Sequence, residues 1–378
     1  MGAFLLLASA CSLEAALGVD GDGSAGSSGD AGSDGPGGSG EAGEAGEATT
    51  EAMADSSSGE ETGTDPDPPP MECVGRRLRV AAFNTQSIEP NGTAGHEALA
   101  DVIGRIDADI VCLEEVLFYE DDELSTLAQQ TGYTRVIQAN PPPAIGGDFT
   151  NACLGRGPMT VEGSYGGWEL SGDPNANDVG RDILVVRADL SEGGEPCGVG
   201  VVSLHLKSGQ EPLDWFRRQV EVERVAQAVV RYRQAHPGEP IVVMGDLNES
   251  IDDPALGHVF TALPEGLPPS YALGSDITFP LTYQPFQTLQ ALGLQVADAT
   301  QEDTVGAYAT WADLVRLDYV LYDGLEAEGD EVYNACRDNG VDDSPQGNWM
   351  PKAGAPLACG VSEQASDHFP VLVDLVIR

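Results

Sequence analysis

Short apolar runs and amphipathic stretches begin near residue 77 and continue to the end of the chain. Apolar residues recur at helical spacing in three stretches, which predicts helices over 96–106, 124–130 and 213–235. Compact apolar runs bounded by Gly, Pro, Asn and Asp predict strands. These runs are 78–83, 109–113, 151–154, 182–186, 198–205, 240–244, 317–322 and 369–376.

The predicted helices and strands do not alternate strictly, so a doubly wound parallel sheet is not expected. Their order favours an α+β fold in which two stacked sheets lie between outer helices. No Gly/Ser-rich or charged linker interrupts residues 73–378, and we therefore predict a single domain there.

Residues 1–72 differ in composition from the rest. Phe4–Ala10 is a short apolar run that precedes Cys11, and it resembles the end of a bacterial lipoprotein signal, although no Lys or Arg comes before it. Residues 19–72 are rich in Gly, Ser, Ala, Asp and Glu, and cannot bury enough apolar surface to offset the entropy of ordering.

The resemblance implies a signal-like segment over 1–18, a disordered acidic tether over 19–72 and a lipid on Cys11. We therefore expect an extracytoplasmic protein, either a cell-surface or outer-membrane lipoprotein or a secreted one. The alternatives are an apolar tail with a free thiol and a low-complexity tail without a role in secretion. Membrane contact is expected only through the lipid, because no apolar run approaches about 20 residues.

The chain is strongly acidic, with 62 Asp and Glu against 18 Lys and Arg and a formal net charge of −44. Residues 1–72 hold 15 of the acids and none of the bases, which leaves 73–378 with a charge of −29. This charge argues against a general nucleic-acid coat, because phosphate is repelled. It does not exclude an enzyme that grips one phosphoester through a metal ion, and it suits a salty medium.

Seven cysteines occur, and six remain in the domain if Cys11 is lipidated. An even number suits an oxidising compartment, but the spacing leaves the pairing open. Cys336 and Cys359 bracket a loop rich in Gly, Pro and Asp that a bond would restrain. Cys112 lies in an apolar strand, and we interpret it as a buried thiol. No CxxC pair occurs, so zinc is not expected.

Polar residues follow or precede the predicted strands, where buried strands deliver them to a shared cleft. Six such motifs occur, namely Phe83–Gln86, Leu113–Val116, Ser203–Ser208, Val243–Glu249, Arg316–Tyr319 and Ser366–Pro370. A lone carboxylate at a strand end is usually solvated or a cap, so the combination matters more than any single residue.

Together the six motifs resemble the endonuclease/exonuclease/phosphatase superfamily, which has the fold of pancreatic-type deoxyribonuclease, over about residues 77–377. Gly245–Asn248 and Ser366–Val371 carry the resemblance as a pair. It implies a four-layer α/β/β/α sandwich of mostly antiparallel sheets and direct in-line attack of water on a phosphoric ester. Glu114 departs from the pattern, because the family usually has Gln before its metal-binding Glu.

Phosphodiesters resist attack because their anionic oxygens repel nucleophiles, and a hard divalent cation offsets that charge. The resemblance assigns the metal ligands to Asn84, Glu115 and Asp367. Mg²⁺ is the expected ion, with Ca²⁺ or Mn²⁺ as alternatives. A second carboxylate at Glu114 could bind metal or raise the pKa of a neighbour.

The resemblance also assigns the catalytic residues. Asp246 would orient or deprotonate the attacking water, and Asn248 would hydrogen-bond a phosphate oxygen. His205 and His368 would flank the phosphate, with Asp318 orienting His368. Which imidazole acts on the water stays open.

Arg181 and Lys207 are further candidates, as contacts to the substrate phosphate. The predicted helix over 213–235 carries more cations, and we expect them to pair with acids on a solvated face. Its arginines are Arg217, Arg218, Arg224, Arg231 and Arg233, and the nearby acids are Glu221 and Glu223.

We expect a monomeric, secreted, metal-dependent phosphoesterase, nuclease-like in its chemistry. The alternative substrates are a phospholipid head group or a small phosphomonoester. A rival of another class is a non-catalytic surface binding module that retains the fold. Hydrolysis of an activated diester with and without chelator would separate these hypotheses.

Overall fold

The computed structural model describes residues 73–118, 121–141, 145–191, 196–301, 308–312, 314–338 and 350–378. The predicted signal-like segment, the tether and Cys11 lie outside these residues, so their assignments stay predictions. Within the described parts of the chain, no helix has the length and apolar character needed to cross a membrane.

The first sheet has seven strands in the order β12-β14-β15-β1-β2-β4-β3. Its pairs are antiparallel except β1 with β2 and β12 with β14, which are parallel. The strands are β1 (Arg77–Asn84), β2 (Ile110–Leu117), β3 (Arg135–Gln138), β4 (Phe149–Gly155), β12 (Thr300–Gln301), β14 (Leu325–Val332) and β15 (Val371–Ile377).

The second sheet has six strands in the order β11-β13-β8-β7-β6-β5, and only β7 and β8 are parallel. Its strands are β5 (Met159–Tyr165), β6 (Ile183–Asp189), β7 (Gly198–His205), β8 (Ile241–Asp246), β11 (Gln295–Val296) and β13 (Asp318–Asp323). A separate antiparallel pair joins β9 (Val259–Phe260) to β10 (Leu281–Thr282).

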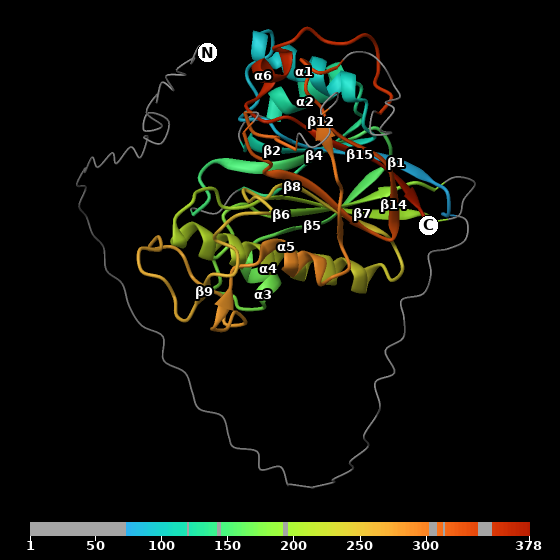
Figure 1. Cartoon of the computed structure of the whole chain (residues 1–378). Helices are drawn as coiled ribbons and strands as arrows, with labels where there is room; N and C mark the ends of the chain where they lie inside the picture. The colour runs from blue at the N-terminus through green and yellow to red at the C-terminus, as the bar shows by residue number, and fades with distance from the viewer. Residues whose placement is uncertain are drawn as a thin grey trace, which may run out of the picture. The chain divides into compact units, whose positions relative to one another are not determined.

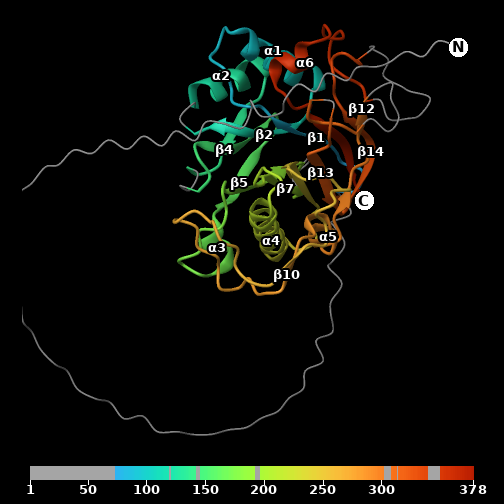
Figure 2. The same ribbon diagram turned by 60° about the vertical axis from the view of Figure 1, so that its left-hand side comes forward.

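Helices cover the outer face of each sheet (Figures 1 and 2). The helices α1 (Ala94–Ile106), α2 (Asp121–Thr131) and α6 (Val361–Ala365) lie on the first sheet. The helices α3 (Gly167–Ser171), α4 (Pro212–Ala235) and α5 (Pro285–Gln290) lie on the second. The result is the expected α+β fold, a four-layer α/β/β/α sandwich whose sheets are mostly antiparallel.

The strand β1 shows how the sequence pattern produces these layers. Successive side chains on a strand point to opposite faces, and both faces of β1 are apolar. Val80 and Ala82 belong to the core between the two sheets, whereas Ala81 and Phe83 pack under the helices of the first sheet. Burial of both faces explains why Val80–Phe83 is continuously hydrophobic.

Three disulfides connect the described cysteines. Cys73 pairs with Cys197, and Cys336 pairs with Cys359, two pairings that the sequence left open. Cys112 pairs with Cys153, which lies directly opposite in the register of β2 and β4. The interpretation of Cys112 as a buried thiol is therefore wrong, because the spacing of the two cysteines along the chain does not reveal a cross-strand register.

Candidate active site

Strand pairing brings the predicted motifs to one place. In the first sheet, Asn84 at the end of β1 lies opposite Glu114 in the parallel strand β2. In the second sheet, Asp246 at the end of β8 lies between His205 of β7 and Asp318 of β13. Because the sheets are stacked, these ends meet, and the Asn84 amide Nδ2 donates to Asp246 Oδ2 across the interface at 3.0 Å.

A bulge in β2 aims Glu115 at the site. The register with β4 shifts between Leu113 and Val116, so Glu114 and Glu115 share the place of one residue. Glu115 has a φ of 58°, in the left-handed region. A bulge re-aims a side chain that regular alternation would point elsewhere. Both carboxylates therefore enter the region of the site, with Glu114 fully buried and Glu115 partly exposed.

The Asp246 carboxylate lies at the centre of the cluster. Its Oδ2 is 3.6 Å from His205 Nε2 and 4.0 Å from His368 Nε2, in addition to the bond from Asn84. The Asn84 amide is also 3.3 Å from Glu115 Oε1, which lies 3.7 Å from His205 Nε2. Five residues assigned by the resemblance thus lie around one point, and their catalytic and metal-binding roles stay predictions.

Asp318 and His368 form a buried pair. His368 Nδ1 lies 2.8 Å from Asp318 Oδ2. Burial disfavours the charged ring, but the Asp318 carboxylate outweighs it and raises the pKa of His368 to about 10. Ser366 accepts from the His368 backbone N–H and donates to the Asn84 carbonyl, which ties this segment to β1.

His205 has the opposite electrostatic environment. Burial, together with the positive charges of Arg181 and His368, lowers the pKa of His205 well below its usual value. Its Nδ1 has no hydrogen-bond partner among the described residues. The two imidazoles therefore differ in charge at neutral pH, with His368 protonated and His205 neutral.

Burial and the neighbouring Asp318 carboxylate raise the pKa of Asp246 to about 7, against the lowering effect of His368. The Asn248 backbone N–H donates to Asp246 Oδ1 at 2.7 Å, and this contact fixes the plane of the carboxylate. The Asn248 side chain donates to the Leu206 carbonyl. Asp246, Asp318 and His368 also present ligand atoms within 4.8 Å of one another, which is a spacing that can hold a metal ion.

The remaining predicted residues lie at different depths. Arg181 lies near Glu115 and Asp246, whose charges act on it, and burial lowers its pKa. Asp367 receives a hydrogen bond from Trp311 Nε1 at 3.1 Å and helps to raise the pKa of His368.

Lys207 is directed elsewhere. Its ammonium lies 3.3 Å from Asp214 Oδ1 and donates to the Ser208 carbonyl. To contact a substrate phosphate, the side chain would have to leave these partners. Its proposed role stays a prediction.

Glu114 is a fully buried carboxyl group, and neither of its oxygens has a hydrogen-bond partner among the described residues. Burial and the charges of Asp318 and Asp246 raise its pKa well above the usual value. Oxygen Oδ1 of Asp318 is unpartnered as well. The residue that departs from the family pattern is thus the most strained electrostatic group in the site.

Three of the five arginines of α4 are buried, which corrects the expectation of a solvated face for these residues, whereas Arg231 is exposed. Arg217, Arg218 and Arg224 are at most 6% exposed. Arg224 pairs with Asp178 and Asp276, both at 2.6 Å. The charge pattern along the helix was misleading because these partners come from distant loops, which sequence spacing does not reveal.

Two buried residues of α4 hold the loops that carry the candidate residues. Arg218 Nε donates to the Lys207 carbonyl at 2.9 Å, and Arg218 Nη1 lies 2.7 Å from Glu249. Glu221 accepts the backbone N–H groups of Gly180 and Lys207. The segments after β7 and β8 and the segment that carries Arg181 are therefore fastened to one helix. Sequence analysis did not identify Arg218 or Glu221 as part of the site.

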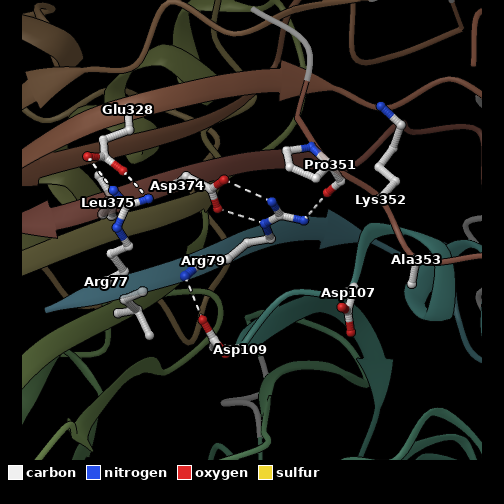
Figure 3. Close-up of a pocket in the computed structure, with 11 residues that line it drawn as sticks. Arg77, Arg79, Asp107, Asp109, Glu328, Pro351, Lys352, Ala353, Asp374 and Leu375 are labelled. Atoms are coloured by element: carbon white, nitrogen blue, oxygen red, sulfur yellow. Dashed lines mark hydrogen bonds and ion pairs between the residues drawn. The ribbon is translucent and has the colours of Figure 1, made fainter. Parts of the chain in front are cut away.

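A polar pocket of about 350 Å³ lies at the start of β1 (Figure 3). Arg79 forms a two-bond pair with Asp374, and Arg77 pairs with Glu328. The pocket is at the opposite end of β1 from Asn84. Because both arginines already have carboxylate partners, we do not assign a substrate to it.

The sequence matches the model of the Endonuclease/Exonuclease/phosphatase family over residues 81–368. The chain belongs to this family. Members of the family generally hydrolyse phosphoester bonds, which agrees with the cluster around Asp246. No curated protein matches the sequence.

Several solved structures are similar to the chain. The endonuclease/exonuclease/phosphatase from Bacteroides vulgatus is 17% identical, with a TM-score of 0.49, over 80% of this chain and 100% of that one. The human Nocturnin catalytic domain with bound sulfate is 16% identical, with a TM-score of 0.47, over 80% and 95%. Truncated TDP2 from Caenorhabditis elegans is 15% identical, with a TM-score of 0.45, over 79% and 98%.

Proposed function

We propose that the chain is a secreted, metal-dependent phosphoesterase that hydrolyses phosphodiester bonds by direct in-line attack of water. The observation that carries this proposal is the convergence of Asn84, Glu115, His205 and His368 on the Asp246 carboxylate, from two sheets. Such a cluster of buried titratable groups with strongly shifted pKa values is typical of catalytic sites.

The donor set suits a divalent cation such as Mg²⁺. The carboxylates of Glu115 and Asp246 both approach the Asn84 amide, which is the hydrogen-bond donor between them. Among the described residues, oxygen Oδ1 of Asp318 and both oxygens of Glu114 are buried without hydrogen-bond partners. Hard cations prefer oxygen ligands, and we assign the ion to Glu115, Asn84 and Asp367 on the basis of the family resemblance. When bound, the ion would offset the charge of the phosphate oxygens.

Asp246 is the group placed to activate water. Its carboxylate, with a pKa of about 7, can accept a proton at neutral pH. The Asn248 backbone N–H fixes the orientation of this carboxylate. A water held against Asp246 Oδ2 would be oriented for attack on a phosphorus atom bound beside it.

The two histidines have separate roles. Asp318 holds the His368 ring in place and keeps it protonated, so Nε2 can donate to a phosphoryl oxygen or to the leaving oxygen. The neutral His205 lies between Glu115 and Asp246 and can hydrogen-bond the phosphate without adding charge. Arg181 is buried nearby and supplies a positive charge for the phosphate.

The charge of −29 on residues 73–378 favours small esters over long polyanions at low salt. We place the enzyme outside the cytoplasm, with Cys11 as a lipid attachment site. The three disulfides support this location, because such bonds persist in oxidising compartments.

The test is hydrolysis of a substrate panel by the wild type, by Asp246→Asn and by Asp338→Asn. Asp338 is a buried carboxylate paired with Arg105 at 2.7 Å, so its replacement controls for loss of a buried charge. We expect Asp246→Asn to lower kcat by at least about 100-fold and Asp338→Asn to leave kcat within about threefold. Equal rates for the wild type and Asp246→Asn would favour the non-catalytic binding module.

The same panel separates the candidate substrates. Plasmid nicking reports nuclease activity, release of choline phosphate reports action on a phospholipid head group, and release of inorganic phosphate reports monoester hydrolysis. We expect a phosphodiester to be cleaved fastest. Faster release of inorganic phosphate from a monoester would overturn this choice.

A further inference from the structure

A pocket of about 860 Å³ adjoins the segments that carry Asn248 and Asp318. One wall is formed by residues 250–252, which begin two positions after Asn248, and another by residues 314–316, which end two positions before Asp318. Three of its lining side chains are large, exposed and apolar or aromatic, namely Ile251 (45%), Tyr308 (38%) and Leu314 (73%). The volume and the mixed lining are those of a site for an organic ligand.

Arg316 is the distinctive residue of this pocket. Its guanidinium lies 4.4 Å from the ring centroid of Tyr319 and 5.8 Å from that of Tyr308, and it donates to the Ala297 carbonyl at 2.8 Å. Arg316 Nε is buried without a partner, and the residue forms no ion pair with any described carboxylate. Burial lowers the pKa of Arg316.

Among the described residues, Arg181, Arg217 and Arg316 combine a buried Nε that has no hydrogen-bond partner with the lack of an ion pair. Arg181 in the candidate active site has the same combination of features: a buried Nε without a partner, no described ion pair and a pKa lowered by burial. For Arg181 the missing partner is the substrate phosphate. The same reasoning applied to Arg316 points to a second anion supplied by a ligand.

Only Leu317 lies between Arg316 and Asp318 along the chain, so the Cα atoms of Arg316 and Asp318 are at most about 7 Å apart. Asp252 and Asp298 also line the pocket and are exposed. Their charges repel a long polyanion, so they favour a small substrate of which a single anionic group enters.

We propose that this pocket binds the part of the substrate beyond the scissile phosphate, with a second anionic group on Arg316. The substrate class is then a nucleotide-sized phosphodiester that carries a further phosphate. Tyr308 and Leu314 pack against its planar or apolar portion, and the guanidinium of Arg316 pairs with its second anion. This inference rests on the proposed function for its substrate chemistry and on the pocket for its specificity.

The experiment compares two esters that differ only in the second anion. They are the p-nitrophenyl ester of thymidine 5′-phosphate and the same ester with a 3′-phosphate. We expect the wild type to have a kcat/KM about tenfold or more higher for the ester with the 3′-phosphate, through a lower KM. In Arg316→Gln the ratio of the two kcat/KM values should fall to about 1, and in Arg316→Lys it should be partly retained.

Arg231→Gln is the matched control. Arg231 also lies over a tyrosine ring, 4.8 Å from the Tyr165 centroid, and donates to a backbone carbonyl, that of Glu169. It lines another pocket of the surface. The control should retain the preference for the 3′-phosphate. A preference that survives in Arg316→Gln, or that is lost equally in Arg231→Gln, would overturn the inference.

Failure of the proposed function is distinguishable from failure of this pocket. If the wild type hydrolyses neither ester nor bis-p-nitrophenyl phosphate, the enzymatic proposal fails, and calorimetric binding of thymidine 3′,5′-bisphosphate then tests the pocket alone. We expect binding to the full chain to weaken about tenfold or more in Arg316→Gln. Equal affinity of the two proteins, or no binding to the wild type, would overturn the inference.

Discussion

Replacement of Glu114 by Gln should stabilise the protein, although it alters a residue in the candidate active site. Glu114 is fully buried, neither carboxylate oxygen has a described partner, and Asp318 and Asp246 repel its charge. Glutamine has nearly the same size and no charge. The substitution therefore removes the electrostatic penalty without opening a cavity.

The pH dependence has a definite sign. Burial raises the pKa of Glu114 in the folded protein above its unfolded value. Below the unfolded pKa the carboxyl is protonated in both states and costs nothing. Above it, the unfolded state ionises first, so folding loses stability until the pH passes the folded pKa. The advantage of Glu114→Gln should therefore be small near pH 4 and should grow toward neutral pH.

Each pH unit between the unfolded and the folded pKa of Glu114 costs about 1.4 kcal/mol of folding free energy, because the unfolded carboxyl ionises there and the folded one does not. For a domain of this size each kcal/mol shifts Tm by about 2–4 °C, so the gain should grow by about 3–6 °C for each of these pH units. Thermal unfolding followed by circular dichroism from pH 4 to pH 8, in the presence of chelator, measures this difference.

Glu331→Gln is the matched control, because Glu331 is equally buried but pairs with Lys352 at 3.0 Å. Its replacement removes the carboxylate that lies 3.0 Å from the buried Lys352 ammonium and should lower Tm. A lower Tm for Glu114→Gln at every pH would refute the reasoning. It would show that the Glu114 carboxylate is ionised in the folded protein and is held by a favourable partner.

Three further outcomes follow from the structure. Arg218→Met should lower kcat at least about tenfold, because Arg218 joins the loops after β7 and β8. The control Arg105→Met breaks an equally buried ion pair remote from the site and should lower Tm alone. Steady-state kinetics of both variants measures the difference. In chelator, Asp318→Asn should lower the free energy of unfolding most below about pH 6.5 and progressively less toward pH 10. The reason is that the pKa of His368 in the folded protein is raised to about 10, so the charged ring is present up to that pH. Urea unfolding across this range measures the trend, and the opposite trend would show that Asp318 does not hold the imidazolium. Added NaCl should raise Tm of the full chain by screening its charge of −44, and a Tm independent of salt would count against self-repulsion.

The sequence predicted the central strands well because both of their faces are buried. The run that becomes β1 and the run that becomes β7 are continuously apolar, and each was located to within about one residue. The strand β14, in contrast, was missed. Half of its Leu325–Val332 segment is charged, because the short strand β12 pairs with it only at Glu331 and Val332 and part of the rest faces solvent, so it has no apolar run to detect.

The candidate site was predictable where its residues lie at the ends of such strands. Asn84, Asp246 and Asp318 follow directly from the strand pattern and the family motifs, and the registers place them together. The supporting contacts were not predictable. Arg218 meets Glu249 only because α4 packs across the second sheet, and no local pattern encodes that tertiary contact.

The most direct test of the active site is the effect of metal on Glu115. Turnover of bis-p-nitrophenyl phosphate by the full chain should stop in chelator and return with Mg²⁺, and in Glu115→Gln the Mg²⁺ concentration needed for half-maximal rate should rise about tenfold or more. Turnover that is insensitive to chelator, or a Glu115→Gln variant with unchanged Mg²⁺ dependence, would contradict a cation held at this cluster.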